Sequence, residues 1–373
     1  MSSGIAILGA GIFAKEAHLP SLAALGHAAP VLKAVYSRSE KSAHDLADAA
    51  AIALRLTPPA VYHDGDKSTD LDALLARSDI DAVIVVLPIT LQPSVILKAL
   101  AAGKHVLSEK PVAPDVAQGL GLIQTYNTTY KAKGLIWRVA ENFEAEPGFR
   151  AAAAAIASGK IGKVIFFRTV VCNYIDKDSK WYKTPWRTVP DYQGGFLLDG
   201  GVHTIAALRI MLPHRLTHLS GFASLNKDYL EPHDTINAIV RAGDNFHGTA
   251  ELTWASPTKS RPVTDGFVIT GTDGWLSVNQ VTIEGANDPV LRITVKSVIK
   301  AEGKGEVEKE EIIEEPVQGV KAELASFFDA IAGKDALNIG EPLEALRDVA
   351  FIQAALNSNG SVVDLAELAP SAL

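Results

Sequence analysis

The chain has 373 residues, 47% of them hydrophobic and 21% charged, which is typical of a globular protein too long for a single core. Its formal net charge of −8 provides no basic field for nucleic acid or for an anionic membrane surface, so we expect neither as a partner. The single cysteine, Cys172, excludes an internal disulfide framework and a thiolate metal cluster, and we expect it to be buried and inert.

No stretch of the sequence is long and apolar enough to span a bilayer. The first residues, Met1 to Ser3, lead into a strand-like run without the charged start and apolar segment of a signal peptide. We therefore expect a cytoplasmic protein that acts on a small molecule.

The first third of the chain alternates between short apolar runs and segments with helical spacing. The apolar runs lie at 5–8, 31–37, 81–88, 105–111 and 134–143. The third of them is continuously apolar and ends in a proline, as expected of a parallel strand buried on both faces. This alternation predicts an α/β fold, a Rossmann domain with a doubly wound parallel sheet, over residues 1–143.

A glycine-rich turn follows the first strand. Gly9 allows the tight turn, Gly11 lets the backbone approach a pyrophosphate, and Ala14 permits close packing of the helix that begins there. Ile12 and Phe13 complete this G-x-G-x-x-A fingerprint, and the helix N-terminus faces the anion. The turn therefore predicts a dinucleotide site. No chemistry is assigned to the polar residues of the following helix, which are Lys15, Glu16 and His18.

The end of the second strand indicates which dinucleotide binds. NAD enzymes place Asp or Glu here for the ribose hydroxyls, whereas this chain has Ser37 and Arg38, with Lys41 close behind. A guanidinium binds phosphate oxygens in a fork and stacks on adenine. The sequence therefore predicts a preference for NADP(H) over NAD(H).

Residues 144–373 have a different pattern, which predicts a second domain of the α+β class. An alanine-rich helix at about 147–158 precedes a large, mostly antiparallel open sheet, whose runs lie at 163–174, 216–225, 234–243, 246–256, 265–280 and 290–299. We expect helices to cover one face and the other face to mediate association into a homodimer or homotetramer. The remaining segments are a charge-rich connector or edge strand at 304–315 and closing helices near 318–333 and 341–357.

Side chains suited to chemistry occur at two places. Lys110 comes directly after a strand of the first domain, at the carboxyl edge where ligands of open α/β sheets bind. Pro88 closes the preceding strand beside the expected nicotinamide position, and Asn142 at the end of the last parallel strand is a candidate contact for nicotinamide or substrate. Asp199 and His203 are four residues apart at the start of an apolar helix, so their side chains share one face.

These motifs resemble those of the glucose-fructose oxidoreductase/inositol dehydrogenase/MocA-type (Gfo/Idh/MocA) family. The glycine turn, the Glu109-Lys110-Pro111 tripeptide and the Asp199 to His203 helix occur in the order and spacing of that family, and the resemblance covers essentially the whole chain. The segments at 140–142 and 184–190 resemble a fungal or yeast-type NADP-linked branch.

The resemblance implies a hydride exchange between nicotinamide and a hydroxyl or carbonyl group, often on a sugar carbon. His203 would accept the hydroxyl proton as general base, while the Lys110 ammonium stabilises the developing alkoxide. Asp199 would orient His203 or Lys110. Glu109 would support the turn that carries Lys110 and join the cofactor site, and Pro111 would shape that turn as a cis peptide. No metal is predicted, because no ligand cluster has recognisable spacing.

The substrate contacts are placed in the segment before this helix. Trp186 and Arg187 are candidates, because an aromatic face can stack on a sugar ring and a guanidinium can hold a hydroxyl or carboxylate. These residues, together with Trp181 and Tyr182, are equally suited to packing between domains. His233 and Asp234 precede a strand, and no role is assigned to them.

Two alternative functions remain open at this point. The first is a non-catalytic sensor of the same fold, which the presence of Lys110, Asp199 and His203 disfavours. The second keeps the cofactor but changes the reaction to reduction of an imine or enone, or to transient oxidation during glycoside cleavage. Use of one NADP(H) per product would favour a simple dehydrogenase or reductase.

Overall fold

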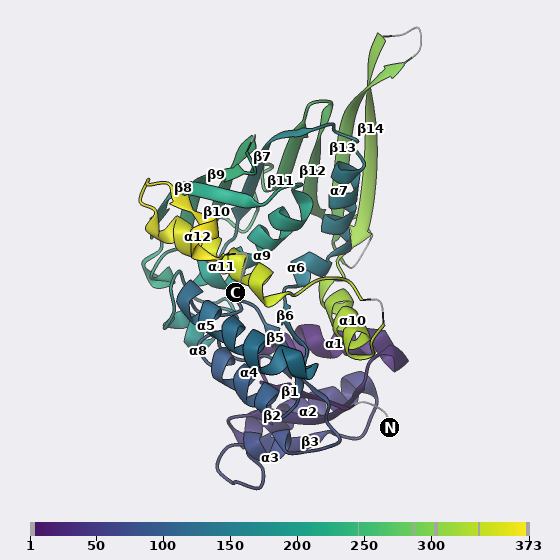
Figure 1. The fold of residues 1–373 in the computed structure, drawn as a ribbon, viewed down its shortest axis with the longest axis vertical. Coiled ribbons are helices and arrows are strands. Elements are labelled where there is room, and N and C mark those ends of the chain that lie inside the picture. The colour runs from purple at the N-terminus through teal and green to yellow at the C-terminus, as the bar shows by residue number, and fades with distance from the viewer. Residues whose placement is uncertain (1–3, 245, 286–287, 302–304, 335, 371–373) are drawn as a thin grey trace. The chain divides into compact units, whose positions relative to one another are not determined.

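The computed structural model describes residues 4–244, 246–285, 288–301, 305–334 and 336–370 (Figure 1). Their contacts divide the chain into two units, the first formed by Met1–Asn142 with Val320–Leu346 and the second by Phe143–Gly319 with Arg347–Ala372.

The first unit contains a six-stranded parallel sheet, which confirms the predicted Rossmann domain. Its strands are β1 (Gly4–Leu8), β2 (Val31–Ser37), β3 (Ala60–His63), β4 (Ala82–Val85), β5 (His105–Glu109) and β6 (Trp137–Ala140). The order β3-β2-β1-β4-β5-β6 reverses beside β1, and ligands of such sheets bind outside the carboxyl ends of the strands at that reversal. β3 was not predicted, because its apolar run spans only Ala60 to Tyr62 and none of its residues is fully buried.

Helices connect these strands. They are η1 (Ala14–His18), α1 (Leu19–Leu25), η2 (Gly26–Ala28), α2 (Glu40–Leu54), α3 (Leu71–Leu75), α4 (Gln92–Ala101), α5 (Val116–Thr125), η3 (Tyr126–Tyr130) and η4 (Lys131–Lys133).

A helix from late in the sequence completes the core of this unit. α10 (Gly319–Ile331) inserts Leu324, Phe327 and Phe328 among the buried residues of the parallel sheet and its helices. The sequence placed this helix in the second domain, within 144–373. Its apolar face instead belongs to the first unit, a long-range association that no local pattern reveals.

The second unit contains a nine-stranded sheet in the order β14-β13-β12-β11-β7-β10-β9-β8-β15. Its strands are β7 (Val164–Cys172), β8 (Leu216–Ser224), β9 (Thr235–Ala242), β10 (Phe246–Thr253), β11 (Gly266–Gly271), β12 (Gly274–Val281), β13 (Val290–Ala301), β14 (Gly305–Pro316) and β15 (Val363–Asp364). β7 and β10 pair in parallel, and the other pairs between the described strands are antiparallel. The mostly antiparallel sheet is therefore confirmed.

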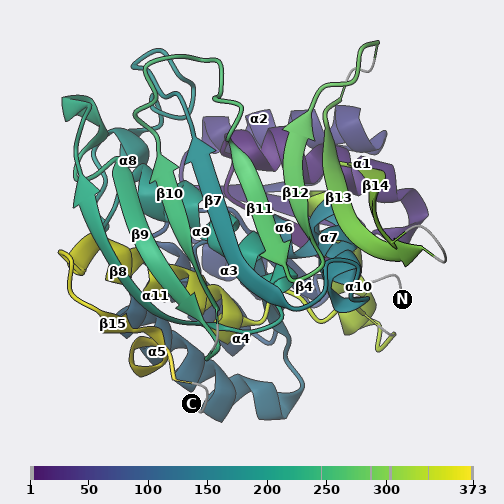
Figure 2. The same ribbon diagram turned by 90° about the horizontal axis from the view of Figure 1, so that it is seen from above.

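The helices from residue 142 onward, α10 aside, are α6 (Asn142–Ala145), α7 (Pro147–Ala157), α8 (Pro185–Thr188), α9 (Phe196–Met211), η5 (Asp228–Leu230), α11 (Pro342–Asn357) and α12 (Leu365–Leu368). α7 and α9 cover one face of the nine-stranded sheet (Figure 2). Side chains of β9 alternate between this buried face and solvent, as expected of a sheet with one covered face. Ile239, Phe166 and Trp275 lie among the exposed side chains, with 63%, 45% and 37% of their surface accessible.

The charge-rich segment at 304–315 corresponds to β14, an edge strand rather than a connector, although Lys304 lies outside the described residues. Cross-strand ion pairs hold it to β13, with 2.6 Å between Arg292 and Glu314 and 3.2 Å between Lys296 and Glu310. Charged side chains on an edge strand also discourage pairing with other chains. In the described ranges, no helix has the length and apolar character needed to cross a membrane.

Candidate active site

The glycine turn after β1 has the geometry that a dinucleotide requires. Gly9 has a φ of +120°, and a Cβ at this position would lie 2.0 Å from the carbonyl oxygen of Val86, so only glycine fits. A Cβ on Gly11 would meet nothing within 4 Å, which leaves open space above the turn where a pyrophosphate can approach the backbone. Ala14 is fully buried. The residues present therefore fit a bound dinucleotide.

The side chains after β2 lie at the same sheet edge as this turn. Leu8 pairs with Tyr36, so Gly9 and Ser37 follow paired residues of adjacent parallel strands. Arg38 is exposed, and so is Lys41 in the first turn of α2.

A carboxylate that the sequence did not single out follows the neighbouring strand β3. Asp64 accepts a hydrogen bond of 2.7 Å from the hydroxyl of Tyr36, and burial together with this carboxylate raises the pKa of that hydroxyl. Asp64 is thus already engaged by a protein donor.

Lys110 follows β5 at this edge. Val85 of β4 pairs with both Leu8 of β1 and Ser108 of β5, so the segments after all three strands emerge together. The peptide bond between Lys110 and Pro111 is cis. The sheet edge therefore gathers the predicted residues Gly9, Gly11, Ile12, Phe13, Ser37, Arg38, Lys41, Pro88, Glu109, Lys110 and Asn142.

Glu109 and His18 form a buried pair that the sequence did not predict. His18 is fully buried, and its Nε2 lies 2.8 Å from Oε1 of Glu109. His18 ends η1, a π-helical turn in which the N–H of Leu19 donates to the carbonyl of Ala14. Pro20 lacks the N–H that a regular α-helix needs next, which favours this irregular turn. His18, to which no chemistry was assigned, thus supports the residue that precedes Lys110.

In the second unit, α9 carries Asp199 and His203 one turn apart, as predicted. The ring of His203 stacks on that of Phe143, with 4.7 Å between centroids and 24° between planes. Gly200 follows Asp199 in this helix. A Cβ at Gly200 would lie 2.5 Å from the Trp254 ring, so the close packing of α9 against Trp254 requires glycine.

Asp199 is buried and paired with Arg187. Nε of Arg187 donates to Oδ2 of Asp199 over 2.8 Å. The guanidinium lies over Trp186 and near Trp181, with 3.9 Å and 5.2 Å from its carbon to the ring centroids. Of the two residues predicted as substrate contacts, Arg187 therefore pairs with Asp199, and Trp186 packs against the Arg187 guanidinium. Tyr192 packs beside Trp186. The pKa of the Tyr192 hydroxyl is raised, mainly by burial and to a smaller extent by the negative charge of Asp199.

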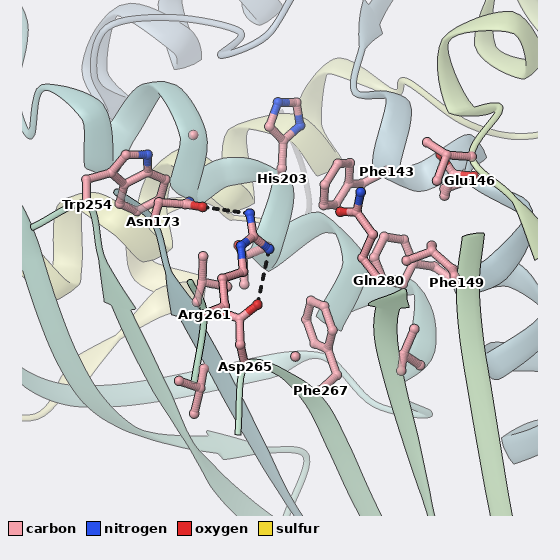
Figure 3. A pocket seen from close by; sticks show the side chains of 18 residues that line it. Phe143, Glu146, Phe149, Asn173, His203, Trp254, Arg261, Asp265, Phe267 and Gln280 are labelled. Carbon is pink, nitrogen blue, oxygen red and sulfur yellow. Dashed lines mark hydrogen bonds and ion pairs between the residues drawn. The ribbon is translucent and has the colours of Figure 1, made fainter. Parts of the chain in front are cut away.

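A cavity of about 290 Å³ lies within the second unit and is bordered by His203 (Figure 3). Sheet residues, among them Phe267 and Gln280, form one wall, and α6, α7 and α9 form the other. Sequence reasoning missed these lining residues, although the alternation of β11 and β12 marks Phe267 and Val278 as inward-facing.

Other polar candidates take structural positions. Asp234 is fully buried and accepts hydrogen bonds from the backbone N–H groups of Asn226 and Lys227, at 2.8 Å and 2.7 Å. Cys172, expected to be buried, is only half-buried because it ends β7, and burial raises the pKa of its thiol. Across the ranges that the structure describes, no group of three or more His, Cys, Asp and Glu side chains is arranged to hold a metal ion.

The fold, the glycine turn of the first unit and the α9 residues of the second unit define a two-unit protein with a dinucleotide-binding Rossmann unit. Two family models match the chain: residues 3–133 match "Oxidoreductase family, NAD-binding Rossmann fold", and residues 149–277 match "GFO/IDH/MocA C-terminal domain". Together they show that the chain belongs to the Gfo/Idh/MocA family of oxidoreductases, as its motifs predicted.

Individual relatives agree with this assignment. Dehydrogenase FPY6 of Fusarium mangiferae is 41% identical over 365 residues, which are 95% of this chain and 96% of that protein. A 1,5-anhydro-D-fructose reductase of Ensifer adhaerens is 27% identical over 72% of this chain and 74% of that protein. The crystal structure of an oxidoreductase (TM0312) from Thermotoga maritima superposes with a TM-score of 0.81 at 29% identity, covering 99% of this chain and 100% of that one.

Proposed function

We propose that the protein is an NADP(H)-dependent dehydrogenase or reductase that acts on a hydroxyl or carbonyl group of a small, sugar-like substrate. The observation that carries this proposal is the position of Lys110, which follows β5 at the sheet edge where the dinucleotide turn follows β1. The name of the Ensifer adhaerens relative supports a sugar-like substrate.

A nicotinamide cofactor held by the glycine turn and the segment after β2 would supply or accept the hydride. His203 takes the hydroxyl proton during oxidation and returns it during reduction. The ammonium of Lys110 donates a hydrogen bond to the reacting oxygen and stabilises negative charge as it develops there. Asp199, with its charge balanced by Arg187, keeps α9 and the segment that carries Arg187 in a fixed arrangement.

The cofactor preference rests on charge. Arg38 and Lys41 are both exposed at the carboxyl edge of the sheet, where the 2′-phosphate of NADP(H) distinguishes it from NAD(H). The nearby carboxylate of Asp64 is bonded to Tyr36, which leaves the cationic side chains to recognise the phosphate.

We further propose that the protein forms a homodimer or homotetramer through the open face of the nine-stranded sheet. Apolar side chains gather there, among them Ile239, Phe166 and Trp275. Light scattering on the purified protein tests this, and replacement of Ile239 by Glu should yield a smaller species.

The proposed reaction is tested by measuring cofactor binding and turnover separately. The purified protein is titrated with NADP(H) and NAD(H), and the nicotinamide absorbance is then followed with a panel of aldoses, polyols and small carbonyl compounds. Turnover lost in Lys110→Met and His203→Asn, with NADP(H) binding retained, is the expected result. Tight binding without turnover of any panel member would instead favour the sensor function.

A further inference from the structure

The cavity beside His203 begins with a continuous row of aromatic rings. His203 stacks on Phe143, Phe143 lies 5.2 Å from Phe149, and Phe149 meets Phe267 edge-to-face at 5.3 Å between centroids. This row runs from His203, the proposed proton acceptor, to Phe267 on β11 of the sheet (Figure 3). Aliphatic side chains line part of the remaining wall, and they are Val170, Val278, Leu291 and Val317. Polar side chains, among them Asn173, Arg261 and Asp265, line another part. A group that enters along the row of phenylalanines therefore meets mainly apolar surface.

The charged groups around the cavity already have protein partners. The guanidinium of Arg261 donates to Asn173 over 2.9 Å and to Asp265 over 3.1 Å. Glu146 accepts hydrogen bonds of 2.9 Å from the backbone N–H groups of Gln318 and Gly319. The polar atoms of these groups are therefore hydrogen-bonded within the protein, and a charged ligand group would lose its hydration against the apolar part of the wall.

The volume of about 290 Å³ exceeds what a small hydroxyl group needs. An apolar cavity of roughly 150 Å³ holds benzene, so this one accommodates a substituted ring or a branched alkyl chain. Small-molecule sites combine such apolar walls with a few convergent polar groups, here His203 and Gln280.

We propose that this cavity binds an aryl or branched-alkyl substituent of an uncharged substrate whose reacting hydroxyl or carbonyl group lies at His203. The inference rests on the proposed function and narrows its substrate class. A simple polyol would leave the row of phenylalanines without apolar contact, whereas each buried methylene group raises affinity roughly fourfold.

The test is equilibrium binding by calorimetry to the full-length protein, with and without saturating NADP⁺. The probes are 3-phenylpropan-1-ol and glycerol. We expect the phenyl compound to bind at least about tenfold more tightly, since several apolar carbons are buried. The same probes, with 3-phenylpropanal for the reverse direction, are then assayed for turnover.

Two variants fill the cavity and one serves as a matched control. Val278→Phe adds a ring at an inward-facing position with 1% of its surface accessible, and Gln280→Trp blocks the exposed rim with little risk to folding. Val298→Phe adds the same ring to β13 at a position that is 41% exposed and outside the cavity lining. We expect at least tenfold weaker phenylpropanol binding in the first two variants and less than twofold change in the control.

The outcomes separate this inference from the proposed function. Phenylpropanol binding that the filling variants abolish supports the cavity assignment even when no alcohol is turned over, in which case the proposed reaction fails. Turnover of polyols by a protein that binds both probes equally overturns the cavity assignment and leaves the reaction standing. Unchanged phenylpropanol binding in a folded Gln280→Trp and Val278→Phe also overturns it.

Discussion

Nε2 of His18 lies 2.8 Å from Oε1 of Glu109, and both side chains are buried in the first unit. When Glu109 is a carboxylate it only accepts hydrogen bonds, and Nε2 of His18 is then the donor of the pair. The pair ties the helix that begins at the dinucleotide turn to the end of β5, one residue before Lys110. It therefore couples the two parts of the proposed cofactor site.

Replacement of His18 should destabilise the first unit. His18→Ala leaves the Glu109 carboxylate buried without its donor, and we expect the free energy of unfolding to fall by about 3 kcal/mol. His18→Gln retains an N–H donor and should lose only about 1 kcal/mol. Urea unfolding followed by circular dichroism measures both. Equal losses in the two variants would show that packing, rather than the hydrogen bond, accounts for the effect.

In the second unit, removal of one partner from a buried ionic group should be costly. Arg209 on α9 donates to both carboxylate oxygens of Asp348, at 3.1 Å and 2.9 Å, and also to Glu144. Arg209→Met removes the guanidinium from two buried carboxylates, and the expected loss is roughly 3–5 kcal/mol. The control is Arg77→Met, which removes the partly exposed pair with Asp79 and should cost about 1 kcal/mol or less. Similar urea midpoints for the two variants would contradict the prediction.

Local sequence was sufficient for most of the strands and long helices and for the principal motifs. The apolar runs predicted five of the six parallel strands. Gly9, Lys110 and His203 each belong to a short motif whose spacing is enough to single them out as candidate site residues. The remaining features depend on contacts between distant segments. His18 and Glu109 are 91 residues apart, and α10 adds Phe327 to a core formed mainly from the first 142 residues. The cavity is assembled from several strands and helices, so no single stretch of sequence reveals it.

His105 should make stability depend on pH. Burial lowers the pKa of His105 below its usual value near 6.5, and this effect exceeds the smaller, opposite effect of the Asp81 charge. Nδ1 of His105 accepts a 3.0 Å hydrogen bond from the N–H of Ile136. The unfolded chain therefore binds the proton more readily. The stabilisation is complete above pH 6.5 and is lost as the pH falls toward the lower folded-state pKa, by at most about 1.4 kcal/mol per pH unit.

Unfolding measured between pH 7 and pH 5 checks this prediction. His105→Asn retains an acceptor near Nδ1 but does not titrate, so its stability should fall less steeply with pH. Replacement of the exposed His44 by Asn is the control for the loss of one imidazole. An identical slope for His105→Asn and the native protein would exclude His105 as the titrating group.

Arg187 has two candidate roles: it positions Asp199 through their ion pair, or it binds substrate directly. If it positions Asp199, Arg187→Met removes the guanidinium from this buried carboxylate one helical turn before His203, and kcat should fall roughly tenfold to a hundredfold with little change in KM. Arg187→Lys keeps the charge and should recover part of the loss. Steady-state kinetics with the first active substrate distinguishes these roles, because a raised KM at constant kcat would assign Arg187 to substrate binding.

Arg38 should determine cofactor selectivity. A charge-assisted hydrogen bond contributes about 1.5–3 kcal/mol, so Arg38→Asp should weaken NADP⁺ binding roughly tenfold to a hundredfold, with NAD⁺ binding unchanged or improved. The matched control is Arg55→Asp. Arg38 precedes the first residue of α2 and Arg55 follows the last one, so the 15-residue helix, about 22 Å long, separates them. It makes the same change in net charge and should leave the ratio of the two affinities unchanged.

Because the interaction with phosphate is ionic, the NADP⁺ affinity of the native protein should also fall with added salt, and this dependence should weaken in Arg38→Asp. A native protein that prefers NAD⁺, or an affinity ratio that Arg38→Asp and Arg55→Asp alter equally, would show that Arg38 does not read the 2′-phosphate.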